Sequence, residues 1–133
     1  MKTLLSFLKL SFLPQSTDLA LLVLRMATGV MMFWLHGLGK LLDFATKSAD
    51  FPDPLGLGSG PSLAMAILAE GVGSILIILG LFTRGAALLG VVTMLVAGLI
   101  VTKGEELPLL YLFSYITLFC AGAGRFALDP HVK

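Results

Sequence analysis

Hydrophobic residues fill four long stretches of the 133-residue chain, and polar or turn-forming residues separate them. A bilayer core about 30 Å thick is crossed by about 20 helical residues, so each stretch predicts a membrane-spanning helix. Polar N-cap residues and a first-turn proline help to mark where these helices begin. The predicted spans cover residues 19–42, 63–82, 85–101 and 107–124. The pattern therefore predicts an all-α fold and a single membrane domain over residues 1–133.

The connections between the spans differ in length, and this constrains the packing of the helices. Very short turns follow the second and third spans, so the helices that they join must be antiparallel neighbours, and an up-down-up-down four-helix bundle follows. The long connection, residues 43–61, mixes aspartates, prolines and glycines with apolar side chains. We expect it either to fold back as a lid over the mouth of the bundle or to form a plain surface loop.

The first 13 residues, MKTLLSFLKLSFL, combine lysines with leucines and phenylalanines. A secretory signal is disfavoured because Lys9 interrupts the apolar run and no small-residue cleavage site follows. A short interfacial amphipathic helix, lying at the membrane surface, is the better interpretation.

Composition supports a membrane class and narrows the chemistry. Hydrophobic residues make up 57% of the chain, charged residues 13%, and the mean hydropathy is +0.99, all outside the usual range of soluble domains. The net charge of +1 gives no reason to expect a nucleic-acid partner. Cys120 is the single cysteine, which excludes an internal disulfide and a CxxC redox relay. Only two histidines are present, and we predict no metal site and no intrinsic cofactor.

Basic residues near the ends of the spans predict the orientation. One side of the predicted bundle carries five of them (Lys2, Lys9, Arg84, Arg125 and Lys133) and the other carries three (Lys40, Lys47 and Lys103). By the positive-inside rule, both termini are expected in the cytoplasm, with the protein in a bacterial-type inner (plasma) membrane.

Three ionisable residues share one stripe of the first span. At about 100° per residue, His36 lies about 20° and Lys40 about 60° round the helix from Arg25. Gly29 falls on the same stripe, where it permits close approach of a neighbouring helix or a flat ligand. An ionisable group at hydrocarbon depth is a functional-site hypothesis by default, so this stripe is expected to face the bundle interior.

Acidic residues complete the predicted site. Glu70 is the one acidic residue well inside a span, and Glu106 lies at the start of the fourth. The estimated depths place Arg25 and Glu70 together within the bundle, with His36, Lys40 and Glu106 above them. The candidate ligand-binding residues are Arg25, Gly29, His36, Lys40, Glu70 and Glu106, and His36 and Glu70 are the candidates for proton transfer.

Structural roles compete with these assignments. Arg25 can snorkel to headgroups or form a fold-specifying ion pair with Glu70. A hydrogen-bonded structural role is the more common state of an interfacial histidine such as His36, and Lys40 near a helix end fits an anchor better than a base.

Three segments resemble the DoxX family of small four-helix membrane proteins. The run LLVLRMATGVMMFWLHGLGKL, residues 21–41, is similar to the opening signature, and AEGVGSILIILGLFTRGAALLG, residues 69–90, is similar to the second. The segment GAGRFALD, residues 122–129, resembles the Gly-x-Gly-Arg close, with Ala123 where proline is common. The three matches occur in order along nearly the whole chain.

The resemblance implies a redox setting, because the family takes its name from a subunit associated with quinone-linked sulfur oxidation. Some members are associated with membrane oxidoreductase complexes that handle thiols or oxidative stress. The leading hypothesis is an inner-membrane subunit of a redox-linked complex that binds a quinone or similar lipid-soluble ligand, with a soluble or membrane redox partner. The alternatives are a non-catalytic membrane scaffold and a small solute or proton transporter working as a homo-oligomer.

Overall fold

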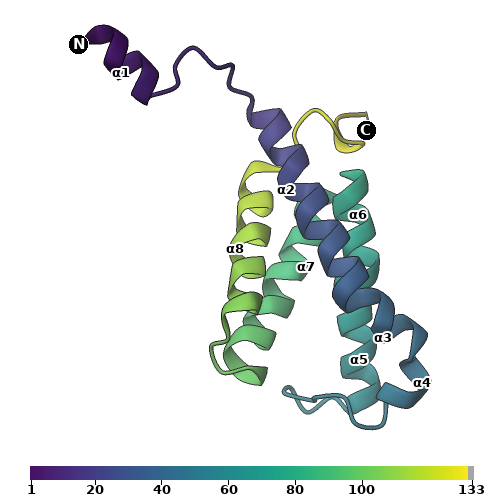
Figure 1. The fold of residues 1–133 in the computed structure, drawn as a ribbon. Coiled ribbons are helices and arrows are strands. Elements are labelled where there is room, and N and C mark those ends of the chain that lie inside the picture. Colours follow the sequence, from purple (N-terminus) through teal and green to yellow (C-terminus); the bar gives the residue numbers. More distant parts are fainter. Residues whose placement is uncertain (132–133) are drawn as a thin grey trace.

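The computed structural model describes residues 1–131, and every regular element among them is a helix. The longer helical segments, here called rods, pack side by side, and a short helix extends from one end of the assembly (Figure 1). In chain order the elements are α1 (Lys2–Leu8), α2 (Thr17–Met32), η1 (Phe33–Gly37), α3 (Leu38–Leu42), α4 (Phe44–Lys47), α5 (Ser59–Ile67), η2 (Leu68–Val72), α6 (Gly73–Leu79), α7 (Thr83–Leu95), η3 (Val96–Val101), α8 (Glu106–Ala121) and η4 (Asp129–His131).

Three of the rods are long and apolar enough to cross a membrane. They cover Thr17–Leu42, Ser59–Leu79 and Thr83–Val101. The fourth rod, α8, is a shorter apolar helix of 16 residues, or about 24 Å at 1.5 Å per residue. The ends of the four rods differ from the ends of the predicted spans by at most four residues.

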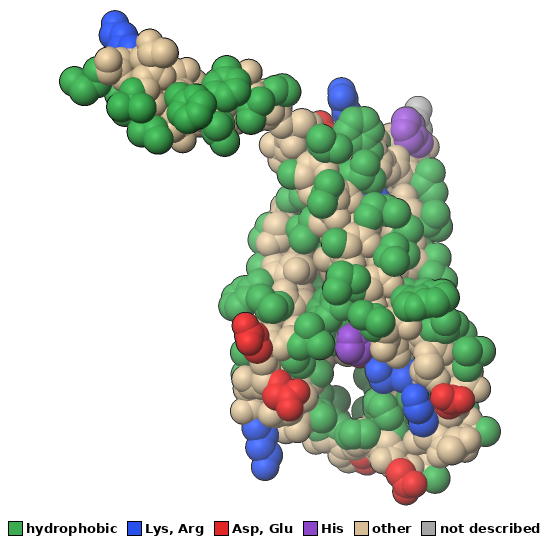
Figure 2. All heavy atoms as spheres, viewed as in Figure 1, with side chains coloured by type: hydrophobic (Ala, Val, Ile, Leu, Met, Phe, Trp, Pro, Cys, Tyr) green, Lys and Arg blue, Asp and Glu red, His purple; other side chains and the backbone are tan. Residues whose placement is uncertain are grey.

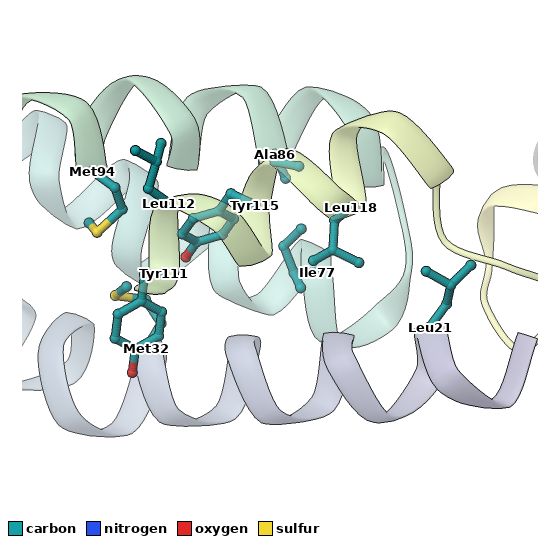
Figure 3. Packing of buried hydrophobic residues seen from close by; sticks show 10 residues of the cluster. Leu21, Met32, Ile77, Ala86, Met94, Tyr111, Leu112, Tyr115 and Leu118 are labelled. Atoms are coloured by element: carbon teal, nitrogen blue, oxygen red, sulfur yellow. The ribbon is translucent and has the colours of Figure 1, made fainter. Parts of the chain in front are cut away.

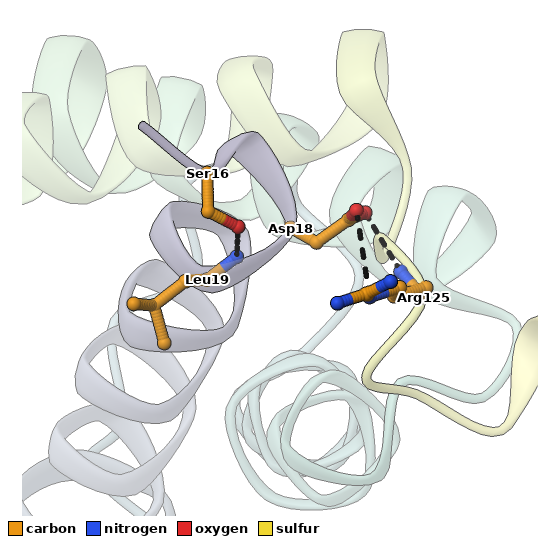
Figure 4. Close-up of polar contacts among 4 residues, drawn as sticks. All are labelled: Ser16, Asp18, Leu19 and Arg125. Carbon is orange, nitrogen blue, oxygen red and sulfur yellow. Dashed lines mark hydrogen bonds and ion pairs between the residues drawn. The ribbon is translucent and has the colours of Figure 1, made fainter. Parts of the chain in front are cut away.

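Local sequence explains where the rods begin and end. Ser16 is the N-cap of α2, and its hydroxyl accepts a hydrogen bond from the Leu19 N–H at 3.1 Å (Figure 4). The second rod ends where Gly80 adopts a φ of +66°, which is easily reached only without a β-carbon. Gly122, with a φ of +77°, ends α8 in the same way. The caps therefore fix the lengths of the apolar rods.

Each of the three long rods contains one π-helical turn, namely η1, η2 and η3. A π turn inserts an extra residue into a helix and is frequent at functional sites. Each of these turns includes a glycine: Gly37, Gly71 and Gly98. The turns η1 and η2 contact one another, so irregular backbone from two rods meets inside the bundle.

A continuous apolar core lies between the rods (Figure 3). Its buried members are Leu21, Met32, Ile77, Ala86, Ala87, Met94, Tyr111, Leu112, Tyr115 and Leu118. The outward faces are also apolar, with exposed side chains such as Val30, Leu95 and Phe113. Such large exposed apolar surface is rare on a soluble monomer, and together with the rod lengths it indicates an integral, multi-pass membrane protein.

Residues 122–131, here called the C-terminal segment, fold back onto the turn between α6 and α7 (Figure 1). The N–H groups of Leu128 and Asp129 donate to the carbonyls of Leu79 and Gly80, at 3.2 and 2.8 Å. The Asp129 carboxylate accepts the N–H groups of Phe82 and Thr83, at 2.6 and 3.0 Å, and so caps the start of α7. At the same end of the bundle, Asp18 of α2 accepts the Arg125 N–H at 3.0 Å (Figure 4).

The N-terminal helix α1 is almost wholly exposed and extends away from the rods (Figure 1). Leu4, Phe7 and Leu8 lie on one arc of the helix, while Lys2 and Ser6 lie on the other. The helix covers residues 2–8 of the 13 for which the sequence predicted an interfacial amphipathic helix. Its placement at the membrane surface stays a prediction.

Candidate functional site

Arg25 lies at the opposite end of its rod from the other polar residues of the stripe. Its side chain is fully buried, and Nη1 donates to the carbonyls of Ile77 and Ile78 at 3.3 and 3.2 Å. Nη2 donates to the carbonyl of Phe126 in the C-terminal segment. Ile77 and Ile78 lie in the last turn of α6, where the helix dipole favours a cation. The Ile77 carbonyl also accepts the Gly80 N–H at 3.1 Å.

The Arg25–Glu70 contact expected from the sequence is therefore not formed. Glu70 lies seven residues before Ile77, about 11 Å further along the second rod. The guanidinium satisfies a helix end instead and ties the first rod to the C-terminal segment. Of the roles considered for Arg25, this position supports a structural one.

A second polar cluster forms where η1 and η2 meet. Lys40 of α3 and Glu70 of η2 make an ion pair, with 2.6 Å between Nζ and Oε2. The same Nζ donates to the His36 carbonyl at 3.3 Å. Both charged side chains are largely buried, with 18% of Lys40 and 10% of Glu70 exposed, so the pair neutralises two charges that would be costly alone.

Glycine permits this close approach of the two rods. A β-carbon on Gly37 would lie 2.7 Å from the Glu70 carbonyl carbon and 2.9 Å from the Gly71 nitrogen, closer than real contacts allow. The backbone of η1 thus rests directly on the backbone that carries Glu70. Gly37 was not singled out from the sequence, although its place between His36 and Lys40 was a usable signal.

A cavity of about 280 Å³, here called the loop-covered cavity, lies on one side of the Lys40–Glu70 pair. Apolar side chains dominate its wall, and Ser62 and Thr93 are its other polar members. Residues Phe51, Pro52, Pro54, Leu55 and Leu57 of the long connection form part of that wall. Of the two roles expected for residues 43–61, this placement matches the lid.

A second cavity of about 220 Å³, here called the Tyr111 cavity, lies on the other side of Glu70. Its wall includes His36, Thr102, Glu105 and Tyr111. The rings of His36 and Tyr111 meet edge to face, with 5.7 Å between their centroids. Figure 2 shows a hollow in the lower part of the bundle, bordered by a histidine and by basic side chains.

Glu70 lines both cavities and is 92% buried. On one side it faces an apolar space under the loop, and on the other it faces a space with hydroxyl, imidazole and carboxylate groups. A carboxylate in this position can exchange a proton between two compartments of different polarity.

The remaining predicted residues take different places. Gly29 allows α2 to approach α6, because a β-carbon there would lie 2.6 Å from Ile78 Cγ1, so a helix rather than a ligand occupies that approach. Glu106 is exposed in the first turn of α8, and its neighbour Glu105 lines the Tyr111 cavity instead. The structure thus brings His36, Lys40 and Glu70 together, and leaves Arg25, Gly29 and Glu106 outside the two cavities.

Changing Gly37 to alanine is expected to reduce folded protein and lower the unfolding free energy by about 1–3 kcal/mol or more, because overpacking against backbone has no flexible neighbour to yield. The measurement is thermal unfolding of the purified protein in detergent. Gly39→Ala is the matched control, since its nearest contact would be the mobile Lys47 Nζ at 3.7 Å. Equal stability of the two variants would contradict the proposed backbone contact.

Asp53 holds the covering loop in shape. Its carboxylate accepts the N–H groups of Leu57 and Gly58, each at 2.8 Å, and the Ser62 hydroxyl at 2.9 Å. The Gly58 and Ser62 hydrogen bonds hold the pKa of the Asp53 carboxyl below its ordinary value of 3.8. A depressed pKa means that this support is present at neutral pH and is lost only as the pH falls through the lowered pKa.

Asp53→Asn is expected to speed amide hydrogen exchange at Leu57 and Gly58 at neutral pH, on the order of tenfold, because charge-assisted hydrogen bonds are lost. Mass-spectrometric exchange over residues 51–58 provides the measurement. Asp50→Asn, in the same connection, serves as the control and should leave the exchange unchanged. An unaltered rate in Asp53→Asn would show that other contacts hold the loop.

Comparisons with known proteins agree with the membrane fold. The model of the DoxX family matches residues 20–103, which include His36, Lys40 and Glu70. A protein of Haemophilus influenzae, described as an uncharacterized protein, is 38% identical over 110 residues, covering 74% of this chain and 80% of its own. No solved structure matches the chain.

Proposed function

Because this chain belongs to the DoxX family, we propose that it serves in a redox-linked membrane complex and binds a quinone or similar lipid-soluble ligand. The observation that carries the proposal is the loop-covered cavity, whose apolar wall is interrupted by the Lys40–Glu70 ion pair. Ligand pockets are mostly apolar with a few convergent polar groups, and about 280 Å³ lies at the small end of their range.

The residues of the cavity suit a ligand that gains or loses protons at ring oxygens. A bound quinone would supply chemistry in which electrons and protons are taken up together. Glu70 would accept or return a proton at a carboxylate oxygen, and Lys40 would stabilise negative charge on the ligand through its ammonium group. Arg25, one of the ligand-binding candidates from the sequence, is held by backbone carbonyls and does not line the cavity.

The properties of the covering loop suit a cavity that a ligand enters from the membrane and from which water is excluded. Leu55 and Leu57 are about half exposed while also lining the cavity, so the loop presents apolar surface on both sides. A lid of this kind would admit an apolar ligand and keep its charged partners dry, where electrostatic interactions are stronger. Electrons must come from a partner protein, since the chain has one cysteine and two histidines.

The same proposal includes a membrane arrangement with α8 as a fourth span and both termini in the cytoplasm. The packing of α8 along α7 supports it, as does the position of successive connections at alternate ends of the rods in Figure 1. Reporter fusions after residue 131 and within residues 43–58 test it. Cytoplasmic activity of the first fusion and external activity of the second are expected, and the reverse would overturn the orientation.

Native mass spectrometry of protein extracted gently from its own membrane tests ligand binding. The wild-type chain is expected to carry a quinone-sized adduct that Glu70→Gln removes while the variant stays folded. Glu106→Gln is the matched control, because Glu106 is an exposed carboxylate that lines neither cavity, and it should retain the adduct. A wild-type chain that carries no adduct, or binds only another protein, would overturn ligand binding and favour a scaffold.

A further inference from the structure

We propose that the Tyr111 cavity is a water-filled passage that gives Glu70 a proton route to the aqueous edge of the membrane beside Glu105. The passage is distinct from the loop-covered cavity, although Glu70 lines both. The use of the passage by a bound ligand rests on the proposed function. Its hydration and its access to Glu70 rest on the geometry alone.

The lining of the Tyr111 cavity suits water. A buried water needs two to four polar partners, and His36, Glu70, Thr102, Glu105 and Tyr111 offer hydrogen-bonding groups around one space. The volume is about 220 Å³, against about 30 Å³ for one molecule in liquid water, so several waters fit. Polar residues are five of the ten that line the Tyr111 cavity, but only four of the fifteen that line the loop-covered cavity.

The buried Tyr111 hydroxyl also points to water in the cavity. Tyr111 is only 7% exposed, and its hydroxyl oxygen has no hydrogen-bond partner among the described residues. Buried hydroxyl groups are nearly always paired, because an unpaired one loses its hydration without compensation. Water in the Tyr111 cavity supplies the missing partner next to the His36 ring.

The position of the cavity provides the route. Its outer part is formed by Thr102 and Glu105, at the exposed turn between η3 and α8, and its inner part by Glu70. The ionisable groups around Glu70 are Lys40 from α3, His36 from η1, and Tyr111 and Tyr115 from α8. A proton leaving the Glu70 carboxyl oxygen passes through water to His36 or to the Glu105 carboxylate, and the reverse path reloads Glu70.

Cysteine labelling in membrane vesicles tests the passage. In a Cys120→Ala background, Met94→Cys places a thiol in the Tyr111 cavity. Leu95→Cys, one residue further along the chain, places a thiol on the outer surface of the bundle. We expect a small cationic methanethiosulfonate to modify the first at least about tenfold faster, because the reactive thiolate forms where water solvates its charge. Equal labelling, or faster labelling of Leu95→Cys, would overturn the proposal.

A second matched pair of cysteine variants, on another rod, keeps the test decisive if one variant of the first pair folds poorly. Met32 lines the same cavity and is 1% exposed, while the adjacent Met31 is 48% exposed on the outside. Met32→Cys should therefore label faster than Met31→Cys by a similar factor. Labelling needs no ligand, so labelling without a quinone adduct would retain the passage and reject the proposed ligand, and an adduct without labelling would do the opposite.

Tyr111→Phe supplies an independent readout. If water bonds the hydroxyl, its removal loses that hydrogen bond, and the thermal midpoint of the purified protein should fall. In a dry cavity the same change removes an unpaired polar group, so an unchanged or higher midpoint would overturn the proposal.

Discussion

Replacing Arg25 by methionine is expected to lower the free energy of unfolding by about 3 kcal/mol or more. Methionine fills the volume of the aliphatic stem but cannot donate to the carbonyls of Ile77, Ile78 and Phe126. The Ile77 carbonyl keeps the Gly80 N–H at 3.1 Å, so the main loss is at Ile78 and Phe126. Each buried carbonyl left unpaired costs about 1–3 kcal/mol, and the helix end also loses its cation. Denaturant unfolding in detergent micelles provides the measurement.

Arg84→Met is the control for this prediction. Arg84 also donates to a backbone carbonyl, that of Phe119 at 2.9 Å, but it is exposed, so its loss should cost about 1 kcal/mol or less. Arg25→Met should also free the C-terminal segment, giving faster proteolysis after residue 121. An Arg25 variant as stable as the Arg84 variant would show that the three carbonyls find other partners.

Replacing Lys40 by methionine is expected to abolish ligand binding and to cost about 3 kcal/mol of stability, because the Glu70 carboxylate would stay buried without its cation. The pair is about one-tenth to one-fifth exposed, which places the loss at the lower end of the range for buried pairs. Thermal unfolding and native mass spectrometry on the same samples measure the two effects.

The double variant Lys40→Met/Glu70→Gln separates stability from function. Removing both charges of a buried pair is often neutral or stabilising, so the double variant should regain most of the stability lost by Lys40→Met. It should still bind no ligand. Recovery of binding together with stability would show that the pair only supports the fold, whereas an additive loss of stability would show that the two residues act independently.

The helices could be predicted from the sequence because hydropathy and capping residues act locally. The cluster of His36 with Lys40 and Glu70 was also largely accessible, since two of its members share one stripe of the first rod. The hydrogen-bond partners of Arg25 could not be predicted. They are the backbone carbonyls of Ile77, Ile78 and Phe126, and every residue has a carbonyl whatever its side chain.

The π turns explain why the detailed geometry of the site was harder to predict. An inserted residue turns the helix beyond it by about 100°, so angles counted along a regular helix fail past Phe33. Glycine in each π turn was the available signal, because glycine lowers helix propensity in the middle of a span. The lid contacts of residues 51–57 depend on tertiary packing and carry no comparable signal.

The bond between Arg25 and Phe126 also orders the biogenesis of the protein in time. The two residues are 101 positions apart, so the first helix is synthesised and inserted well before its guanidinium can meet that acceptor. Chains grow at about 5–20 residues per second, so Phe126 is synthesised about 5–20 seconds after Arg25. During this interval the Arg25 guanidinium lacks the Phe126 carbonyl, which becomes available only when the C-terminal segment has been synthesised.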